Sequence, residues 1–161
     1  MSQRCFQVEA PSNIALIKYW GKSDPATQWP SNDSLSMTLT QAHTTTTVQQ
    51  LPDNSEDSFV FAGQPVDWTR PFGAKVKKHL QTLKQHFDAP NARFAVASEN
   101  SFPHGCGIAS SASGFAALTV AVAACLTSSE SFAQLAQQGI ERTDLAHLAR
   151  LGSGSACRSL W

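Results

Sequence analysis

The N-terminal part of the chain alternates between short runs of apolar or β-branched residues and clusters of Pro, Asn, Asp and Gly. This pattern is typical of short β-strands that are joined by turns. It predicts five strands, at residues 5–9, 14–20, 35–40, 44–51 and 58–62. Residues 52–57 form the clearest hairpin-like connection, because the segment consists almost entirely of turn-forming residues.

From Pro71 onwards the apolar positions recur at spacings of three and four, at Phe72, Val76, Leu80, Leu83 and Phe87. This period predicts an amphipathic helix over residues 71–87 with its lysines facing outward. Further along, the pattern predicts a strand at 93–98 and helices at 109–126, at about 132–138 with Gly139 as cap, and at about 143–151. Strands followed by a helix, a strand and more helices indicate the α+β class rather than the alternating βαβ order of a dinucleotide-binding fold.

Composition limits the kind of protein this sequence encodes. A length of 161 residues suits one domain with a real core. The 12 basic and 12 acidic residues balance, so nothing indicates a nucleic-acid partner or an anionic membrane surface. The apolar run 115–126 is shorter than the roughly 20 residues of a bilayer span, and the N-terminus lacks a signal-peptide core. We therefore expect a soluble, cytoplasmic protein with no membrane partner.

The four cysteines, Cys5, Cys106, Cys125 and Cys157, are far apart and form no Cys-x-x-Cys motif. The sequence supports neither a zinc site nor a thioredoxin-type motif. Free thiols are the expectation for a cytoplasmic protein of this size.

The stretch 100–117 is rich in small residues. Gly105 and Gly107 allow the chain to pass close to a ligand, while Ser110, Ser111 and Ser113 place hydroxyls at the start of an Ala-rich helix. The free N–H groups at such a helix start would face an anion, and the serines would add donors or ligands for a magnesium ion on the phosphates. It is not a Walker A loop. An ordinary Gly-rich turn with a serine cap is the alternative interpretation.

A second candidate segment, residues 11–22, is an apolar strand that ends in two lysines around two aromatic residues. Lys18 and Lys22 are compact charges suited to an oligophosphate, Tyr19 supplies a hydroxyl, and Trp20 could pack against the apolar part of a substrate. The alternative is a solvated strand end.

Residues 30–39 read as an alternating strand with a polar face that could line a site. The polar positions are Ser34, Ser36 and Thr38, and the apolar positions are Leu35, Met37 and Leu39. A half-exposed strand would give the same pattern.

A second Gly/Ser turn, at residues 150–159, is followed at once by an arginine. Ser153 and Ser155 could donate to phosphate or carboxylate oxygens, and Arg158 offers a planar fork for a carboxylate. A helix cap followed by a flexible end is the alternative interpretation.

Taken together, these segments resemble the mevalonate diphosphate decarboxylases, within the superfamily of galactokinase, homoserine, mevalonate and phosphomevalonate kinases. The shared motifs are residues 13–22, 30–36, 102–117 and 152–159, in the family's order. The resemblance implies the N-terminal domain of the superfamily over residues 1–161, with a ribosomal-protein-S5-like two-layer arrangement of sheet and helices. It also implies a homodimer and the conversion of mevalonate 5-diphosphate to isopentenyl diphosphate with ATP and Mg2+.

The resemblance also implies roles for individual residues. ATP binding is implied for Pro103, Gly105, Gly107, Ser110, Ser111 and Ser113, with Ser110 and Ser111 also at the magnesium ion. Substrate binding is implied for Lys18, Tyr19, Trp20, Lys22, Ser153, Ser155 and Arg158. Arg158 is in addition the implied catalytic residue, which binds the carboxylate and orients the catalytic acid.

The match extends over the N-terminal half of the family's proteins only, and the resemblance implies that their catalytic aspartate lies in the C-terminal half. Asp24 and Asp33 are the acids nearest the substrate-side motifs, yet neither occupies a catalytic position of the family. A fragment or truncated gene product is the expectation, and a complete but catalytically silent nucleotide-binding protein is the alternative. A mevalonate or phosphomevalonate kinase-type enzyme is the competing activity. A truncated domain would leave apolar surface uncovered and favour self-association.

Overall fold

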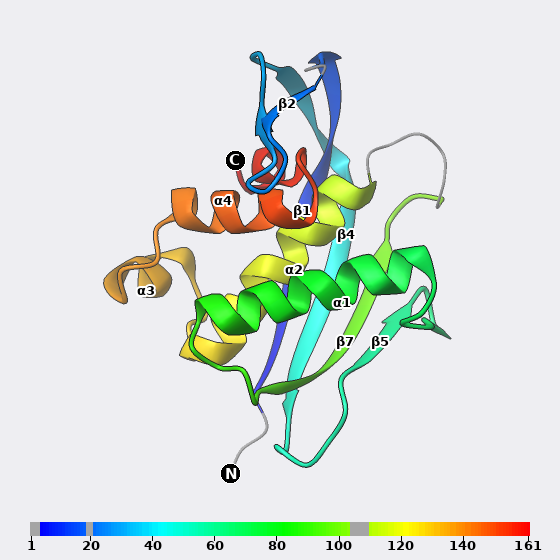
Figure 1. Cartoon of the computed structure of the whole chain (residues 1–161), viewed down its shortest axis with the longest axis vertical. Coiled ribbons are helices and arrows are strands. Elements are labelled where there is room, and N and C mark those ends of the chain that lie inside the picture. Colours follow the sequence, from blue (N-terminus) through cyan, green and yellow to red (C-terminus); the bar gives the residue numbers. More distant parts are fainter. Residues whose placement is uncertain (1–3, 19–20, 104–109) are drawn as a thin grey trace.

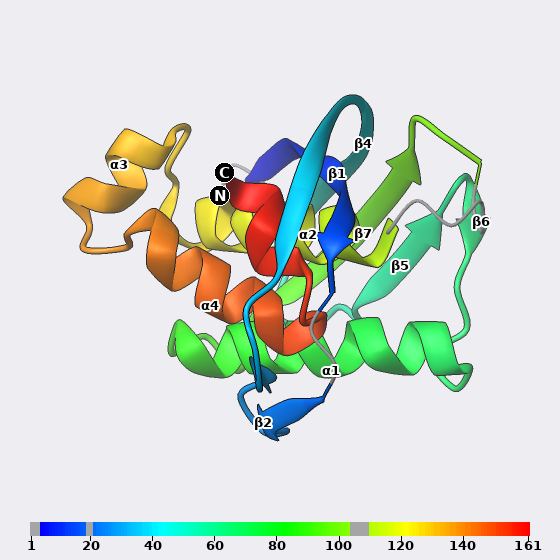
Figure 2. The same ribbon diagram turned by 90° about the horizontal axis from the view of Figure 1, so that it is seen from above.

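The computed structural model describes residues 4–18, 21–103 and 110–161. Figure 1 and Figure 2 show one twisted sheet with helices packed against one of its faces. The strand order of the five-stranded sheet is β1-β4-β7-β5-β6, and β2 and β3 form a separate two-stranded sheet. Sheet and helices make the two layers of an α+β domain, which confirms the predicted class.

Two long strands, β1 (Cys5–Ile17) and β4 (Leu35–Leu51), form the backbone of the sheet. The separate strands predicted at 5–9 and 14–20, and at 35–40 and 44–51, were wrong because each pair is one continuous strand. The apparent break is a bulge: Pro11 pairs with His43 and Ser12 with Leu39, so β4 carries three extra residues there. Ser101 holds this bulge, since its hydroxyl accepts from the His43 N–H (3.0 Å) and donates to the Gln41 carbonyl (3.2 Å).

The remaining strands complete a mixed sheet. β7 (Arg93–Asn100) pairs antiparallel with β4 and parallel with β5 (Ser58–Phe61). β5 in turn pairs with the short β6 (Gln64–Pro65), which the sequence pattern did not predict. The predicted strands at 58–62 and 93–98 are confirmed to within two residues.

Helix α2 (Ser110–Thr127) is the centre of the core. It contacts β1, β4 and α4, and its buried residues include Ala112, Phe115 and Leu118. It is long and apolar enough to cross a membrane by length and composition, but 72% of it is buried inside the protein. Burial on all sides explains its apolar composition.

Helix α1 (Pro71–His86) crosses in front of α2 in Figure 1. Its buried face includes Val76, Leu80 and Leu83, as predicted. The prediction that all its lysines face outward was wrong for Lys84, which is 5% exposed and bonded to Asp57 at 2.5 Å.

The C-terminal part of the chain consists of α3 (Phe132–Gln137), α4 (Arg142–Gly152) and the short 3-10 helix η1 (Ala156–Leu160). In Figure 1, η1 lies beside the projecting end of the β1–β4 pair, and α3 lies farther away. The two first helices were predicted and η1 was not. Two short strands also escaped prediction, β2 (Lys22–Asp24) and β3 (Trp29–Pro30).

Candidate functional site

Arg158 is held at the junction of three elements. Its Nε donates to Asn13 Oδ1 of β1 (3.3 Å), and one terminal nitrogen donates to Ser34 Oγ just before β4 (2.8 Å). Asn13 is 1% exposed, and its Nδ2 donates to Ser159 Oγ at 2.7 Å. Asn13 therefore ties η1 to β1 and fixes the guanidinium of Arg158 within the polar face of the β1–β4 pair.

The two serine-bearing segments predicted from the sequence meet in space. Ser153 follows the end of α4, and its Oγ donates to Ser111 Oγ in the first turn of α2 (3.3 Å). Ser153 Oγ also lies 3.4 Å from Ser155 Oγ. Ser111, Ser153 and Ser155 therefore form one group of hydroxyls, although 42 residues separate the first two.

Gly152 allows this approach. A Cβ at this position would lie 2.3 Å from Phe115 Cδ1 and 2.9 Å from His79 Nδ1, far inside van der Waals contact. Only a glycine lets the end of α4 pack this closely on α1 and α2.

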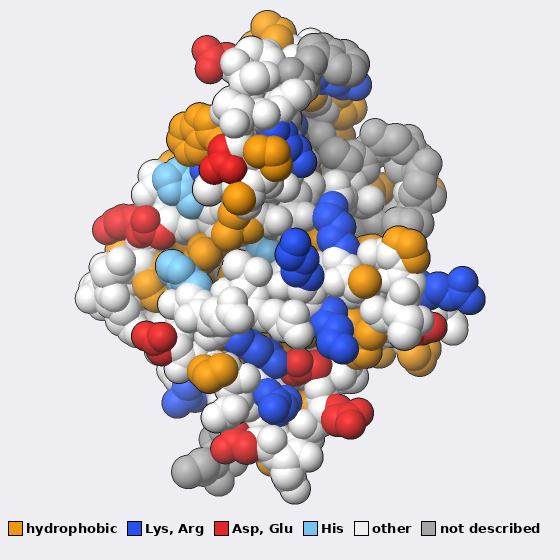
Figure 3. All heavy atoms as spheres, viewed as in Figure 1, with side chains coloured by type: hydrophobic (Ala, Val, Ile, Leu, Met, Phe, Trp, Pro, Cys, Tyr) orange, Lys and Arg blue, Asp and Glu red, His pale blue; other side chains and the backbone are white. Residues whose placement is uncertain are grey.

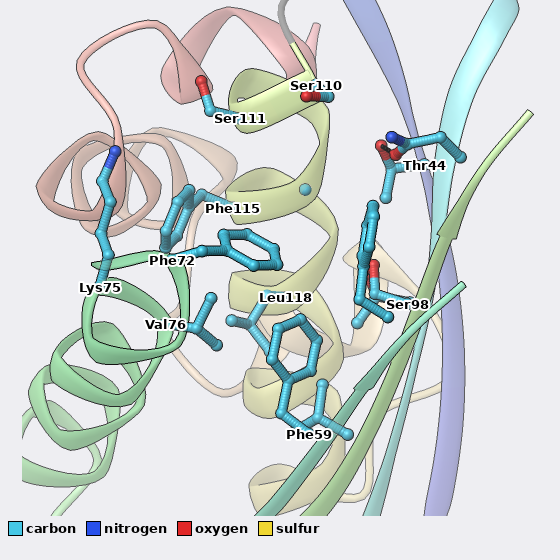
Figure 4. Close-up of a pocket in the computed structure, with 15 residues that line it drawn as sticks. Thr44, Phe59, Phe72, Lys75, Val76, Ser98, Ser110, Ser111, Phe115 and Leu118 are labelled. Atoms are coloured by element: carbon cyan, nitrogen blue, oxygen red, sulfur yellow. Dashed lines mark hydrogen bonds between the residues drawn. The ribbon is translucent and has the colours of Figure 1, made fainter. Parts of the chain in front are cut away.

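A cavity of about 150 Å³ opens between α1, α2 and the sheet (Figure 4). Its walls are mainly apolar, and aromatic rings from three elements contribute to them, including Phe59, Phe72 and Phe115. Ser110 and Ser111 lie at one end of this cavity and Lys75 of α1 borders it. The cavity could take a flat apolar group whose charged end reaches the start of α2.

Asn100 also lines this cavity and leaves a donor unused. Its Oδ1 accepts from Thr44 Oγ1 at 2.8 Å, whereas its buried Nδ2 has no hydrogen-bond partner among the described residues. A buried amide donor costs free energy unless a partner reaches it. A ligand atom that accepts a hydrogen bond would supply that partner.

Ser113 differs from the other predicted serines. It is fully buried, and its Oγ lies 2.6 Å from Thr44 Oγ1 and donates to the Ser110 carbonyl. This hydroxyl joins the start of α2 to β4, and its predicted role at ATP stays a prediction.

Lys22 begins β2, directly after a turn that requires glycine. Gly21 has φ of 93°, a left-handed conformation that side chains rarely adopt. The β2–β3 hairpin docks on α4 through Trp29, whose ring lies 4.3 Å from the Arg150 guanidinium and 6.3 Å from the His147 ring. This contact sets the position of Lys22.

The other predicted site residues are placed less fully. Lys18 is exposed just after β1, and Pro103 is exposed just before residue 104. Tyr19, Trp20, Gly105 and Gly107 lie outside the described residues. Their predicted roles stay predictions.

A magnesium ion would find hydroxyl ligands here. In the part of the chain that is described, no group of three or more His, Cys, Asp or Glu residues could hold a metal. Mg2+ usually keeps several waters and binds substrate phosphates, so two serines at a phosphate site fit it. Ser110 and Ser111 would hold such an ion only together with a phosphate chain.

Asp24 is a poor candidate for a catalytic base. It accepts from Thr27 Oγ1 (2.7 Å) and the Ala26 N–H (2.9 Å), and the Thr27 hydrogen bond is the main reason that its pKa is lowered. The carboxylate therefore shapes the β2–β3 turn.

The apolar face of the projecting β1–β4 pair is exposed. Ile14 pairs with Met37, and Leu16 and Leu35 flank them on the same face. All four side chains are between 41% and 63% exposed. The amphipathic pattern predicted for residues 30–39 is present in part: Ser34 contacts Arg158, whereas Leu35 and Met37 are exposed to solvent.

Sequence reasoning missed Asn13, Lys75 and Asn100 as site residues. Each lies within or beside a segment that was singled out, but their contacts cross 40 to 146 residues of chain. The aromatic residues around position 60 and Phe72 were the available signal for the cavity.

These features define a class: an α+β domain in which a Gly/Ser turn meets the start of a helix beside an apolar cavity that a lysine borders. Within that class, the chain belongs to the family described as diphosphomevalonate decarboxylase-like N-terminal domain, whose profile matches residues 10–161.

Individual relatives agree with this assignment. The diphosphomevalonate decarboxylase of Saccharomyces cerevisiae is 35% identical over 96% of this chain and 39% of its own length. The structure of mevalonate diphosphate decarboxylase from Staphylococcus aureus superposes with a TM-score of 0.84 at 34% identity, covering 98% of this chain and 44% of that one. A structure described as MDDEF in complex with MVAPP, AMPPCP and magnesium superposes on this chain with a TM-score of 0.82 at 39% identity. The match covers 98% of this chain and 44% of that one. The chain therefore spans less than half the length of these relatives.

Proposed function

We propose that this chain supplies the nucleotide- and substrate-binding part of an ATP- and Mg2+-dependent decarboxylation of mevalonate 5-diphosphate to isopentenyl diphosphate. The observation that carries the proposal is the contact between Ser153 and Ser111, which joins the Gly/Ser turn before Arg158 to the start of α2. A phosphoryl transfer requires the two phosphorylated ligands to lie side by side.

The nucleotide would occupy the apolar cavity and the start of α2. Its base would pack among Phe59, Phe72 and Phe115, and an acceptor atom of the base would satisfy Asn100 Nδ2. The phosphates would then reach Ser110 and Ser111, where the helix N-terminus favours negative charge. The complex of MDDEF with AMPPCP and magnesium supports the choice of ATP and Mg2+.

The substrate would lie on the other side of the serine group. Lys18, Lys22, Ser153 and Ser155 would bind its diphosphate, together with Tyr19 and Trp20. Arg158 would bind the carboxylate through its terminal nitrogens, since Asn13 holds Nε and Ser34 holds one terminal nitrogen, which together fix the plane of the guanidinium.

In the reaction implied by the family, the tertiary hydroxyl attacks the γ-phosphate of ATP, gives its proton to the family's catalytic aspartate, and ADP leaves. The new phosphate then leaves with its bonding electrons, the carboxylate leaves as carbon dioxide, and the electrons of the broken carbon–carbon bond form the double bond. Arg158 would orient the carboxylate for this loss, and the cationic groups would stabilise the departing phosphate.

The first test is calorimetric binding of AMPPCP with Mg2+, and of mevalonate 5-diphosphate, to the purified chain. We expect both to bind, and Arg158→Gln to weaken mevalonate 5-diphosphate about tenfold or more while leaving AMPPCP within about twofold. Carbon dioxide release is measured in parallel, with the same substitution in a version extended to the length of the relatives. Failure of both ligands to bind, or an unchanged affinity in Arg158→Gln, would refute the proposal.

We also propose self-association as a homodimer and a cytoplasmic location. The exposed apolar face of Ile14, Leu16, Leu35 and Met37 lies on the edge strand β1 and its neighbour β4, and supports pairing of two copies. Free thiols at the three described cysteines support a reducing compartment. Sedimentation of the wild type and of Leu16→Lys tests the dimer: a wild type that stays monomeric at all concentrations would exclude it. Fluorescent tagging in cells tests the location, and a signal confined to another compartment would exclude it.

A further inference from the structure

The β2–β3 hairpin has little structure of its own to hold it in place. It is a two-stranded sheet separate from the five-stranded sheet, and Figure 2 shows β2 beyond α1, on the helical side of the molecule. Lys22 pairs with Pro30 and Asp24 with Trp29, and Pro30 has no N–H to donate. An isolated hairpin is at best marginally stable in water. The position of this hairpin therefore depends on its contacts with the rest of the protein.

Trp29 makes the contact between the hairpin and α4. Its ring centroid lies 4.3 Å from the guanidinium carbon of Arg150, and the His147 ring lies 6.3 Å away. The Nε of Arg150 is buried and has no hydrogen-bond partner among the described residues, and no described carboxylate forms a salt bridge with this arginine. The indole therefore meets a guanidinium that is partly desolvated. Such a contact changes an equilibrium constant by about 2- to 30-fold.

The two residues of this contact belong to the two segments that carry predicted substrate-side groups. Arg150 lies in the last turn of α4, shortly before Ser153. Trp29 is next to Pro30, which pairs with Lys22. Lys22 and Ser153 both border a cavity of about 400 Å³ between the hairpin, α1 and the Gly/Ser turn. Figure 3 shows basic side chains gathered over α1 and above it on this face. The Trp29–Arg150 contact thus sets the width of the cavity between Lys22 and Ser153.

The contact itself lies outside the described cavity walls. Neither Trp29 nor Arg150 is among the residues that line the 400 Å³ cavity or the apolar cavity. Gly21 precedes the hairpin with φ of 93° and has no side chain that could fix the end of β2. Without the Trp29 contact the hairpin can rotate about Gly21, and Lys22 moves with it. Any effect of Trp29 on a ligand therefore passes through Lys22.

We propose that Trp29 and Arg150 are positioning residues, whose contact keeps Lys22 at a fixed distance from Ser153 and so strengthens the binding of a diphosphate group. The inference rests on the proposed function for the identity of that group, which is the diphosphate of mevalonate 5-diphosphate. The nucleotide would occupy the apolar cavity, so its affinity should not depend on the contact.

Calorimetry with the purified chain compares Trp29→Ala with a matched variant, Phe132→Ala. The Phe132 ring lies 4.3 Å from the Arg142 guanidinium, so this control loses the same kind of contact away from the hairpin. We expect Trp29→Ala to weaken mevalonate 5-diphosphate about fivefold to tenfold, and AMPPCP with Mg2+ less than about twofold. Phe132→Ala should leave both affinities unchanged. Trp29→Phe keeps an aromatic face and should recover most of the lost affinity.

Two further measurements separate positioning from a general loss of stability. In a Lys22→Gln background, Trp29→Ala should change the affinity for mevalonate 5-diphosphate less than about twofold, because the cation that Trp29 positions is absent. Hydrogen exchange of the ligand-free protein should become at least about fivefold faster at residues 22–30 in Trp29→Ala and stay unchanged in α4. Equal losses of affinity in the two backgrounds, unchanged exchange in the hairpin, or equal weakening of both ligands would overturn the proposal.

Inorganic pyrophosphate separates this inference from the proposed function. If the wild type binds both ligands and Trp29→Ala binds them as tightly, the inference fails and the proposed function stands. If the wild type binds neither ligand, yet binds pyrophosphate more tightly than Trp29→Ala does, the proposed function fails and the positioning role stands for a diphosphate anion. If the wild type binds none of the three, both fail.

Discussion

Replacing Gly152 with alanine tests how the Gly/Ser turn is positioned. The added Cβ would lie 2.3 Å from Phe115 Cδ1, 2.8 Å from Phe115 Cγ and 2.9 Å from His79 Nδ1. Both rings are buried and pack edge to face at 5.1 Å, so neither can move without disturbing the contact between α1 and α2. Overpacking of this kind costs about 1–3 kcal/mol. The better helix propensity of alanine offsets at most about 1 kcal/mol.

We therefore expect Gly152→Ala to lower the free energy of unfolding by about 1–2 kcal/mol. Urea denaturation followed by circular dichroism measures this loss, and the same variant should bind pyrophosphate more weakly because Ser153 is pushed away from Ser111. Gly114→Ala is the control, since a Cβ there meets nothing within 4 Å. It should be neutral or stabilising.

A double-mutant cycle identifies the cause. In a Phe115→Ala background, Gly152→Ala should lower the free energy of unfolding by a smaller amount, because the nearest clashing atoms are gone. Equal costs in the two backgrounds, or a Gly152→Ala protein as stable as the wild type, would refute the steric explanation.

Three other predictions concern buried groups. Asp57→Ala should lower the free energy of unfolding, measured by urea denaturation, by about 3–5 kcal/mol, because it leaves the Lys84 ammonium, which is 5% exposed, without its carboxylate. A loss below about 1 kcal/mol would contradict this. For His79, the folded pKa of about 4 lies below the ordinary value, so the unfolded chain binds more protons between pH 4 and 6.5 and stability falls on acidification. From pH 7 to pH 5 the wild type should lose about 2 kcal/mol more than His79→Gln, and equal losses would exclude His79 as the source. Burial raises the pKa of Cys125 to about 11. Iodoacetamide at pH 8 should therefore label the exposed Cys5 and leave Cys125 unlabelled until urea is added, as peptide mass spectrometry would show. Labelling of Cys125 in the folded protein would contradict its burial.

Local periodicity predicted the elements whose packing follows directly from their own sequence. The spacing from Phe72 to Phe87 located α1 within one residue at its C-terminus, because Val76, Leu80 and Leu83 of its apolar stripe are buried. The β-branched run that begins at Thr44 predicted the part of β4 at residues 44–51. The pattern failed where strands pass through the bulge near Pro11 and His43, because proline and polar residues there resemble a turn although the strand continues.

The sequence suggested an anion-binding chemistry for the site, which stays a prediction, and it could not show the long-range contacts of the site. Gly/Ser turns and strand-end lysines indicate phosphate binding by composition alone. The hydrogen bond between Arg158 and Asn13 joins residues 145 positions apart, and no local pattern encodes it. The lysines of α1 looked like an ordinary solvated face, and only the docking of the β2–β3 hairpin through Trp29 turns part of that face into a cleft.

The bulge in β4 divides one strand pair into two parts with separate constraints. On one side of it, Ala10 and Val48 are core residues whose size is fixed by α2 and its neighbours. On the other side, Asn13 and Ser34 contact Arg158, and the opposite face is open. A protein engineer could thus vary the projecting end to change ligand preference without repacking the interior. Ser101, which holds the bulge, would be the residue to leave unchanged in any such library.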